Sequence, residues 1–280
     1  MSFRFDRFAT LYLVNPFRRS VSRNKPSIPI LMYHSISDDA ETGVHPYYRT
    51  STSPQQFASQ MRYLHESGYR TASLPDVVSE LGEQGAVADK HVVITFDDGY
   101  RDFHDNAFPI LDQYDFSATV FLPTAYIGGV RAQFKGKDCL TWSEIRELQK
   151  HGMCFGSHTV THPQLSTLDA GAVISEIATS KQTIQDNLGE SVDSFAYPFA
   201  FPENNKPFIQ MLRTTLVEAG YRQGVSTRIG TARMQEDHYF LRRLPMNSFD
   251  DIPLFEAKLR GSYDWLHKVQ YASKRLRTYF

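Results

Sequence analysis

The chain has 280 residues, of which 30 are Lys or Arg and 31 are Asp or Glu, so its formal net charge is −1. This near balance argues against nucleic acid as a partner, which would favour a basic face. Its two cysteines are too few for a disulfide framework and do not have a metal-type spacing. The length suffices for one large domain with a sizeable core.

A basic, aromatic-rich extension occupies residues 1–27. Arg and Lys are interspersed with Phe and Leu over residues 1–25, and no apolar stretch is long enough for a signal-peptide core or a membrane span. Such a segment is suited to lying on an anionic bilayer, but a helix packed on the domain or a leader would have the same composition. Because no export signal is recognised, we expect a cytoplasmic protein, with peripheral contact at the inner face of the membrane as an open alternative.

From residue 28 onward, strand-like apolar runs alternate with helix-like segments. Residues 53–56 (SPQQ) supply an N-cap, a proline at N1 and a glutamine at N3, and residues 141–144 (TWSE) form a capping box. A third helical pattern covers residues 168–188 and ends at Gly189. The strands are expected at 29–33, 69–73, 92–96, 118–122, 153–157, 194–198, 222–226 and 240–245.

Alternation of strand and helix predicts an α/β fold with a parallel sheet and outer helices. Seven or eight such units predict a distorted (β/α) barrel, which we place over residues 28–260. The remaining residues, 261–280, are predicted to form a C-terminal helical tail.

Two adjacent acids, Asp97 and Asp98, follow the strand predicted over 92–96, and Gly99 follows them. Like charges at the end of a buried strand are unfavourable unless a cation lies beside them. A bound metal, with one Asp as ligand and the other free as a base, would supply that cation. An Asp-Gly turn exposed to solvent is the alternative, and this short motif does not decide between them.

Two histidines four residues apart, His158 and His162, follow the strand predicted over 153–157. Imidazole nitrogens bind divalent metals, and three protein ligands are the usual set of a catalytic zinc site. Asp98 with the two histidines gives that number. Their place at a strand-to-loop junction is where the active site of an α/β barrel lies.

Three motifs together resemble, in order and spacing, the polysaccharide deacetylases of the NodB-homology type, a carbohydrate esterase family. They are TFDDG at 95–99, GSHTVTHP at 156–163 and FAYPF at 195–199. The segment 29–36 (PILMYHSI) also resembles the first strand of many bacterial members. The resemblance covers about residues 28–247 and implies an irregular (β/α) barrel.

The resemblance also implies roles for individual residues. Asp97 would be the general base, and Asp98, His158 and His162 would be the metal ligands. The backbone N–H of Phe199 would stabilise the oxyanion, with Tyr197 and Pro198 beside it in the same substrate-contacting motif. Zinc suits this ligand set, although Co²⁺, Ni²⁺ and Fe²⁺ are also compatible with it.

Two accessory groups of the family are missing from the expected positions. The arginine that orients the base is replaced by Ala196, and the late Leu-x-His motif that supplies the general acid is not evident. Arg243, on the last predicted strand, could take the orienting role, unless it is a surface arginine. His34, at the end of the first strand, is preferred as the acid over His238, which precedes the last strand and would lie at the other end of a regular barrel.

These inferences predict a metal-dependent hydrolase that removes an N-linked acetyl group from an N-acetylated sugar, polysaccharide or lipid-linked precursor. A metal-bound water would attack the amide, and Asp97 would take its proton. Two alternatives remain open: a related amidohydrolase acting on another amide, such as a formamido sugar, and a catalytically silent glycan-binding module.

Overall fold

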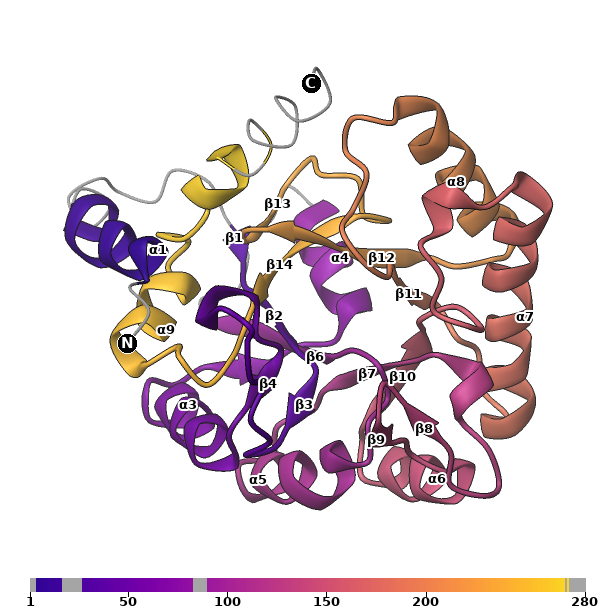
Figure 1. Ribbon diagram of the computed structural model, residues 1–280, viewed down its shortest axis with the longest axis horizontal. Coiled ribbons are helices and arrows are strands. Elements are labelled where there is room, and N and C mark those ends of the chain that lie inside the picture. Colours follow the sequence, from indigo (N-terminus) through magenta and orange to yellow (C-terminus); the bar gives the residue numbers. More distant parts are fainter. Residues whose placement is uncertain (1–3, 17–26, 83–89, 270, 272–280) are drawn as a thin grey trace.

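A closed barrel of parallel strands forms the centre of the molecule (Figure 1). The computed structural model describes residues 4–16, 27–82, 90–269 and 271. Seven strands pair in a ring in the order β2, β14, β12, β11, β10, β7, β6 and back to β2. An eighth, β5 (Arg70–Thr71), pairs with the first half of β6. The predicted α/β barrel is therefore confirmed. The ring strands are β2 (Ile30–Tyr33), β6 (His91–Phe96), β7 (Thr119–Leu122), β10 (Cys154–Ser157), β11 (Ser194–Ala196), β12 (Gln223–Ile229) and β14 (Leu241–Pro245).

Three short strand pairs lie outside the ring. They are β1 (Ser27–Ile28) with β13 (Ala232–Arg233), β3 (Ser35–Ile36) with β4 (Ser51–Thr52), and β8 (Gln133–Phe134) with β9 (Lys137–Asp138). Of these, β8 and β9 form an antiparallel hairpin, and both residues of its turn have positive φ, Lys135 at 51° and Gly136 at 78°. Such a turn matches the twist of the strands it joins.

Helices surround the barrel (Figure 1). Their ends follow the predicted signals: the Ser53 side chain caps α3, the Thr141–Glu144 capping box begins α6, and Gly189 ends α7 with φ of 70°. A π-helical turn (Phe103–Ala107) leads into α5. The helices are α1 (Phe5–Phe8), α3 (Pro54–Glu66), α4 (Leu74–Gly82), α5 (Phe108–Gln113), α6 (Trp142–Lys150), α7 (Ala170–Leu188), α8 (Lys206–Glu218) and α9 (Ile252–Leu259).

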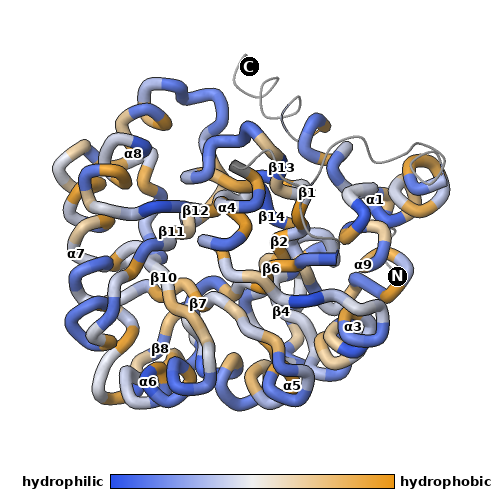
Figure 2. The backbone as a smooth tube through the Cα atoms, turned by 180° about the vertical axis from the view of Figure 1, so that it is seen from behind, coloured by the Kyte–Doolittle hydropathy of each residue, from blue (hydrophilic) through white to orange (hydrophobic). Residues whose placement is uncertain are grey.

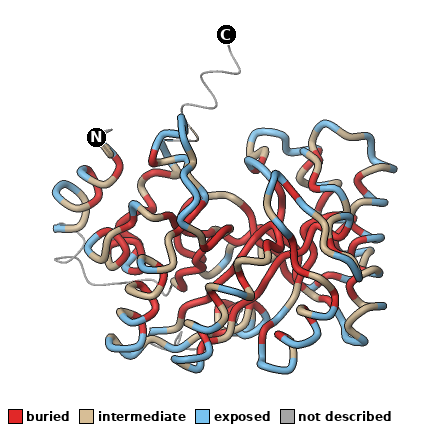
Figure 3. The backbone as a smooth tube through the Cα atoms, turned by 60° about the horizontal axis from the view of Figure 1, so that its bottom comes forward, coloured by how far each residue is buried: buried red, intermediate tan, exposed pale blue. Residues whose placement is uncertain are grey.

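The barrel strands alternate between two apolar layers, because successive side chains of a strand point to opposite faces. The outer layer packs under the surrounding helices and includes Phe96 and Phe195. The inner layer includes Val93 and Phe121, and it packs against α4 through Val77 and other apolar side chains. Seen from behind in Figure 2, α4 lies across the middle of the barrel. One end of the barrel is thereby filled by apolar residues. Buried residues concentrate along the barrel strands (Figure 3).

Candidate metal centre and catalytic site

The polar residues of the site lie at the carboxyl ends of the barrel strands. Along β6 the alternation that turns Val93 inward also turns Thr95 and Asp97 inward, where both contact Arg243 of β14. Asp98 would then point outward if the strand continued. Instead the chain bends, and Asp98 takes a left-handed conformation with φ of 72°. Both carboxylates therefore reach the same end of the barrel, as the sequence predicted.

Asp98, His158 and His162 form a buried cluster whose possible ligand atoms all lie within 4.8 Å of one another. The Nε2 atoms of the two histidines lie 3.7 Å (His158) and 3.2 Å (His162) from Asp98 Oδ1. These contacts are not aligned as hydrogen bonds, so this buried carboxylate oxygen has no donor among the described residues. A bound cation would compensate this buried oxygen, and the donor set of one carboxylate and two imidazoles fits a divalent metal.

His158 is prepared to act as a ligand through Nε2. Its Nδ1 lies 2.8 Å from the carbonyl oxygen of Ala196, which can only accept, so Nδ1 carries the proton. This leaves a lone pair on Nε2, the usual arrangement for a metal-binding histidine. Burial lowers the pKa of His158 to about 4, against the opposing effect of Asp97, so the imidazole is neutral near pH 7.

The loop between the two histidines is held by Glu176 of α7. One carboxylate oxygen of Glu176 accepts the N–H groups of Val160 and Thr161 at 2.8 and 2.9 Å, and the other accepts the Thr161 hydroxyl at 2.7 Å. His162 itself has φ of 56°, a conformation that costs about 1–3 kcal/mol unless its surroundings impose it. Glu176 was not predicted, because a glutamate thirteen residues after the end of the 156–163 motif carries no spacing signal of its own.

Asp97 forms a two-pronged ion pair with Arg243. Arg243 Nη1 donates to Oδ1 and Nη2 donates to Oδ2, both at 2.7 Å, and both side chains are almost completely buried. The arginine is fixed by further hydrogen bonds to Thr95 Oγ1 and to the carbonyl of Ser226. Burial would raise the pKa of Asp97, but the charge of Arg243 and its hydrogen bonds outweigh that effect and hold the pKa below its ordinary value. Asp97 is therefore kept as a carboxylate.

His34 also faces this end of the barrel. It follows β2, its side chain is 21 % exposed, and its Nε2 lies 3.9 Å from Asp97 Oδ2. His238 lies elsewhere: it lines a separate cavity of about 400 Å³ together with residues of α4, at the opposite end of the barrel. The structure thus brings His34, and not His238, to the predicted base.

Of the motif at 195–199, Phe199 lies at the site, whereas the Tyr197 ring lies in the core. Phe199 has φ of 58° and its ring lies 4.8 Å from that of His162, between ring centres. Its backbone N–H has no hydrogen-bond partner among the described residues. Pro198 is buried beside it. The Tyr197 ring, in contrast, points outward and is completely buried against Phe201 and Phe208, so its ring does not lie beside the metal cluster as a substrate contact would.

Two further side chains touch Asp98. The Tyr100 hydroxyl donates to Asp98 Oδ2 at 3.0 Å, and Lys135 Nζ, from the tip of the β8–β9 hairpin, donates to the same oxygen at 3.2 Å. The Phe134 ring lies 5.1 Å from that of His162. Lys135 was not predicted, because a lysine in a loop without periodicity has no distinguishing pattern.

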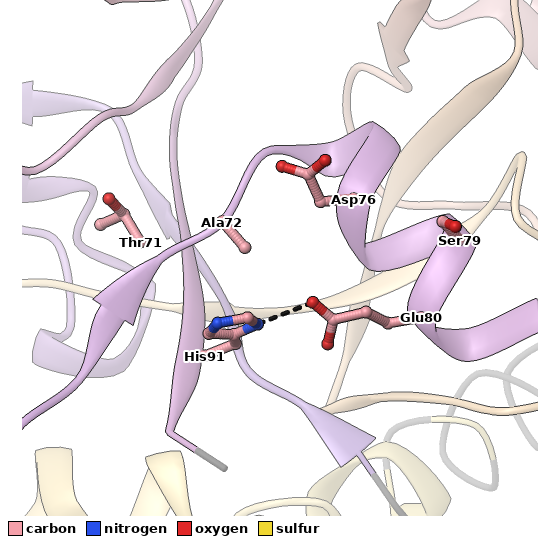
Figure 4. Close-up of a pocket in the computed structure, with 6 residues that line it drawn as sticks. All are labelled: Thr71, Ala72, Asp76, Ser79, Glu80 and His91. Atoms are coloured by element: carbon pink, nitrogen blue, oxygen red, sulfur yellow. Dashed lines mark hydrogen bonds and ion pairs between the residues drawn. The ribbon is translucent and has the colours of Figure 1, made fainter. Parts of the chain in front are cut away.

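A different cavity, of about 300 Å³, lies beside β5 and α4 (Figure 4). In it, His91 Nδ1 lies 2.7 Å from Glu80 Oε1, and Thr71, Asp76 and Ser79 complete the polar lining. It includes none of the predicted site residues, and the sole group of three or more metal-ligating side chains found among the described residues is the Asp98 cluster.

No described helix combines the length and apolar character needed to cross a membrane.

Known sequences similar to this chain point to the same family as the three motifs. A model of the family described as polysaccharide deacetylase matches residues 84–223, half of the chain. The YxkH protein of Bacillus subtilis (strain 168), whose name places it among the polysaccharide deacetylases, is 31% identical over 225 residues, covering 80% of this chain and 73% of its own. The poly-β-1,6-N-acetyl-D-glucosamine N-deacetylase of Staphylococcus aureus (strain MRSA252) is 26% identical over 204 residues, covering 69% of this chain and 67% of its own.

Among solved structures, the Streptococcus pyogenes deacetylase PplD in complex with acetate superposes with a TM-score of 0.73. It is 27% identical, and the match covers 84% of this chain and 99% of PplD.

Proposed function

Because this chain belongs to the polysaccharide deacetylase family, we propose that it is a metal-dependent hydrolase that removes the N-linked acetyl group from N-acetylated sugar residues of a glycan. The observation that carries this proposal is the juxtaposition of two groups. A carboxylate held ionised by Arg243 lies next in sequence to the carboxylate of a buried Asp-His-His cluster. A module that only bound glycans would have no need of a base beside a cation site.

Asp98, His158 and His162 would hold the ion. A divalent cation there supplies Lewis acidity, which polarises the amide carbonyl and makes a nearby water more acidic. We propose Zn²⁺ as the resident ion, and Co²⁺, Ni²⁺ and Fe²⁺ as compatible replacements.

The chain's own residues then move the protons and stabilise charge. Asp97 accepts a proton from the water that attacks the amide carbon, and Arg243 fixes the orientation and ionisation of Asp97. The unpaired N–H of Phe199 donates to the carbonyl oxygen as it becomes negative. His34 donates a proton to the amide nitrogen as the C–N bond breaks, so that acetate and a free amine result.

The names of the relatives support the proposed substrate class. The Staphylococcus aureus relative is named for poly-β-1,6-N-acetyl-D-glucosamine, which supports N-acetylglucosamine residues as the units that this chain deacetylates. A formamido sugar would require the same base and cation site, so it is tested as an alternative substrate.

The test is acetate release from N-acetylglucosamine oligosaccharides by metal-stripped protein, with and without added Zn²⁺. Release should require the metal, and Asp97→Asn should abolish it while still binding Zn²⁺. His34→Ala should lower turnover with little loss of bound metal, whereas His238→Ala, at the other end of the barrel, should behave as wild type. Stoichiometric metal binding without acetate release would contradict the proposed activity, and formate release from a formamido sugar would redirect it.

A further inference from the structure

The described part of the N-terminal extension, residues 4–16, is fixed to the barrel on one side. The buried Asp6 carboxylate accepts hydrogen bonds from Arg4 Nε at 2.8 Å and from the Tyr263 hydroxyl at 2.7 Å. The indole N–H of Trp265 donates to Thr10 Oγ1 at 3.0 Å. The contacts with Tyr263 and Trp265, which follow α9, set which side of the segment faces outward.

The outward side is apolar and aromatic. The exposed fractions are 61% for Phe5, 42% for Phe8, 62% for Tyr12 and 52% for Leu13. The segment is helical from Phe5 to Val14, first as α1 and then as a π-helix, so Phe5, Phe8 and Tyr12 are spaced at about one helical turn, and Leu13 directly follows Tyr12. Isolated exposed apolar residues are common on protein surfaces, but four within nine positions are not.

This side of the molecule adjoins the catalytic end of the barrel. Arg7 Nε donates to Asp251 Oδ1 at 3.2 Å, in the segment that follows β14, and the Arg4 guanidinium lies 6.0 Å from the centre of the Tyr47 ring. The loops around Tyr47 and Asp251 follow β3 and β14, and so lie near the ends of the strands that carry His34 and Arg243. Figure 1 shows α1 beside α9 at this edge of the barrel.

The same loops add two more exposed rings, Tyr48 at 71% and Phe249 at 41%. The Arg49 guanidinium lies 5.0 Å from the centre of the Phe249 ring. We call these six exposed side chains the apolar rim: Phe5, Phe8, Tyr12, Leu13, Tyr48 and Phe249.

The N-terminal segment that carries four of the rim residues is basic in sequence. No Asp or Glu occurs from Arg7 to Ser37, whereas five Arg or Lys residues do. Two acids beside the rim are paired with cations, Asp251 with Arg7 and Asp250 with Lys258 at 2.9 Å, whereas Glu41 accepts hydrogen bonds from Thr50 and Ser51. Aromatic rings interspersed with arginines suit the interface of an anionic bilayer, where rings enter the headgroup region and cations meet lipid phosphates.

We propose that the apolar rim lies in the surface of an anionic membrane and holds the catalytic end of the barrel close to it. The proposal rests on the deacetylase function proposed above and narrows its substrate to a glycan attached to a membrane lipid. The docking of residues 4–16 through Tyr263, Trp265 and Asp251 supports this choice, since a preformed rim loses little conformational freedom on binding.

The test uses the full chain and vesicles made of phosphatidylcholine alone or of equal parts phosphatidylcholine and phosphatidylglycerol. Wild type should sediment with the anionic vesicles and much less with the neutral ones. The double variant Phe5→Ser/Tyr12→Ser should bind the anionic vesicles about tenfold more weakly, because it removes two of the inserted rings. The matched control is Ile174→Ser/Val217→Ser, which removes two exposed apolar side chains on α7 and α8 and should bind as wild type does.

A second readout compares deacetylation of one N-acetylglucosamine oligosaccharide in two forms, free in solution and coupled to a phospholipid in the anionic vesicles. The ratio of the lipid-coupled to the free rate should fall about tenfold in the Phe5/Tyr12 variant. Failure of wild type to bind anionic vesicles would overturn the membrane proposal, as would a rim-dependent dimer seen by analytical ultracentrifugation. An unchanged rate ratio despite vesicle binding would overturn the lipid-linked substrate. Absence of activity on both forms, with vesicle binding intact, would instead count against the deacetylase function alone.

Discussion

At the scale of single residues, the ionisation of Asp97 depends on one buried partner. Arg243 and Asp97 are both nearly inaccessible to solvent, and breaking such a pair by removing one member typically costs about 3–5 kcal/mol. The pair is therefore a fixed element of the site, and the arginine reaches it from a strand 146 residues later in the chain.

The first prediction concerns this pair. Arg243→Gln removes the charge that lowers the pKa of Asp97, so that pKa should rise and the acid limb of the kcat–pH profile should move to higher pH. Turnover near neutral pH should fall by about tenfold to hundredfold, and Arg243→Lys, which keeps the charge, should shift the limb less. Arg242→Gln is the control, because Arg242 is the neighbouring residue and pairs with Glu236 instead. An acid limb that stays in place in Arg243→Gln would argue that the arginine has no orienting role.

A second prediction concerns Glu176, which holds the loop between the two histidine ligands. Glu176→Ala should release that loop and weaken Zn²⁺ binding by about tenfold to hundredfold, as loss of groups that support metal ligands usually does. Zn²⁺ titration of the metal-stripped protein measures the effect. Asp186→Ala, at an exposed site of the same helix, should leave the affinity unchanged; equal affinities in both variants would show that the loop holds its shape without Glu176.

Sequence patterns predicted the site residues that lie in recognisable motifs. They missed residues outside motifs that only the folded chain brings to the site. Asp98, His158 and His162 were predicted as a set and lie together. Lys135 and Glu176 were not predicted, since neither has a spacing that separates it from surface charges. The position of the Tyr197 ring follows from strand alternation, which turns it outward once Ala196 points inward.

At the scale of elements, every predicted strand range overlaps a strand of the structure, because apolar runs bounded by turn residues are informative. No strand is predicted within residues 37–52 and 123–140, where the structure has the two-residue strands β4, β8 and β9. A strand of two residues is too short to be recognised in the sequence as an apolar run. Their pairing is set by the hairpin turn and by neighbouring loops.

The capping box of α6 provides a prediction at this scale. Partial burial would raise the pKa of Glu144, but hydrogen bonds from Arg131 and Thr141 outweigh it and lower that pKa from 4.5 to about 2. The folded protein therefore holds this proton less tightly than the unfolded chain. The resulting stability is complete above about pH 4.5 and is lost as the pH falls toward 2.

Glu144→Gln should accordingly lower the free energy of unfolding at neutral pH by about 1 kcal/mol. The difference from wild type should shrink steadily as urea unfolding is repeated at lower pH within that window. Glu147→Gln, on the same helix with its side chain 65% exposed, should show neither effect. A difference that is independent of pH would mean that the ionised carboxylate does not contribute through the cap.

At the scale of the whole molecule, closure of the barrel requires glycine at two strand positions. A Cβ at Gly156 would lie 2.6 Å from the Phe121 ring and 2.9 Å from the Ser194 carbonyl oxygen. A Cβ at Gly224 would lie 2.4 Å from the carbonyl oxygen of Tyr239. All three distances are shorter than van der Waals contact, and the two carbonyl oxygens are backbone atoms that cannot move aside without displacing the chain.

Gly156→Ala should therefore lower the free energy of unfolding by about 1–3 kcal/mol, and Gly224→Ala by more, as measured by urea denaturation. Gly171→Ala, in the first turn of α7, meets no atom closer than 3.3 Å and should leave stability unchanged or slightly raised. Wild-type stability in Gly224→Ala would show that the strands can separate at little cost.

The helix that fills one end of the barrel has a kinetic consequence. Since α4 and the inner apolar layer close that end, the site opens only at the carboxyl ends of the strands. The two products of deacetylation therefore leave through the same opening. A glycan lying across the mouth would block the smaller product behind it. Acetate would then leave last, and added acetate would compete with the glycan for the free enzyme.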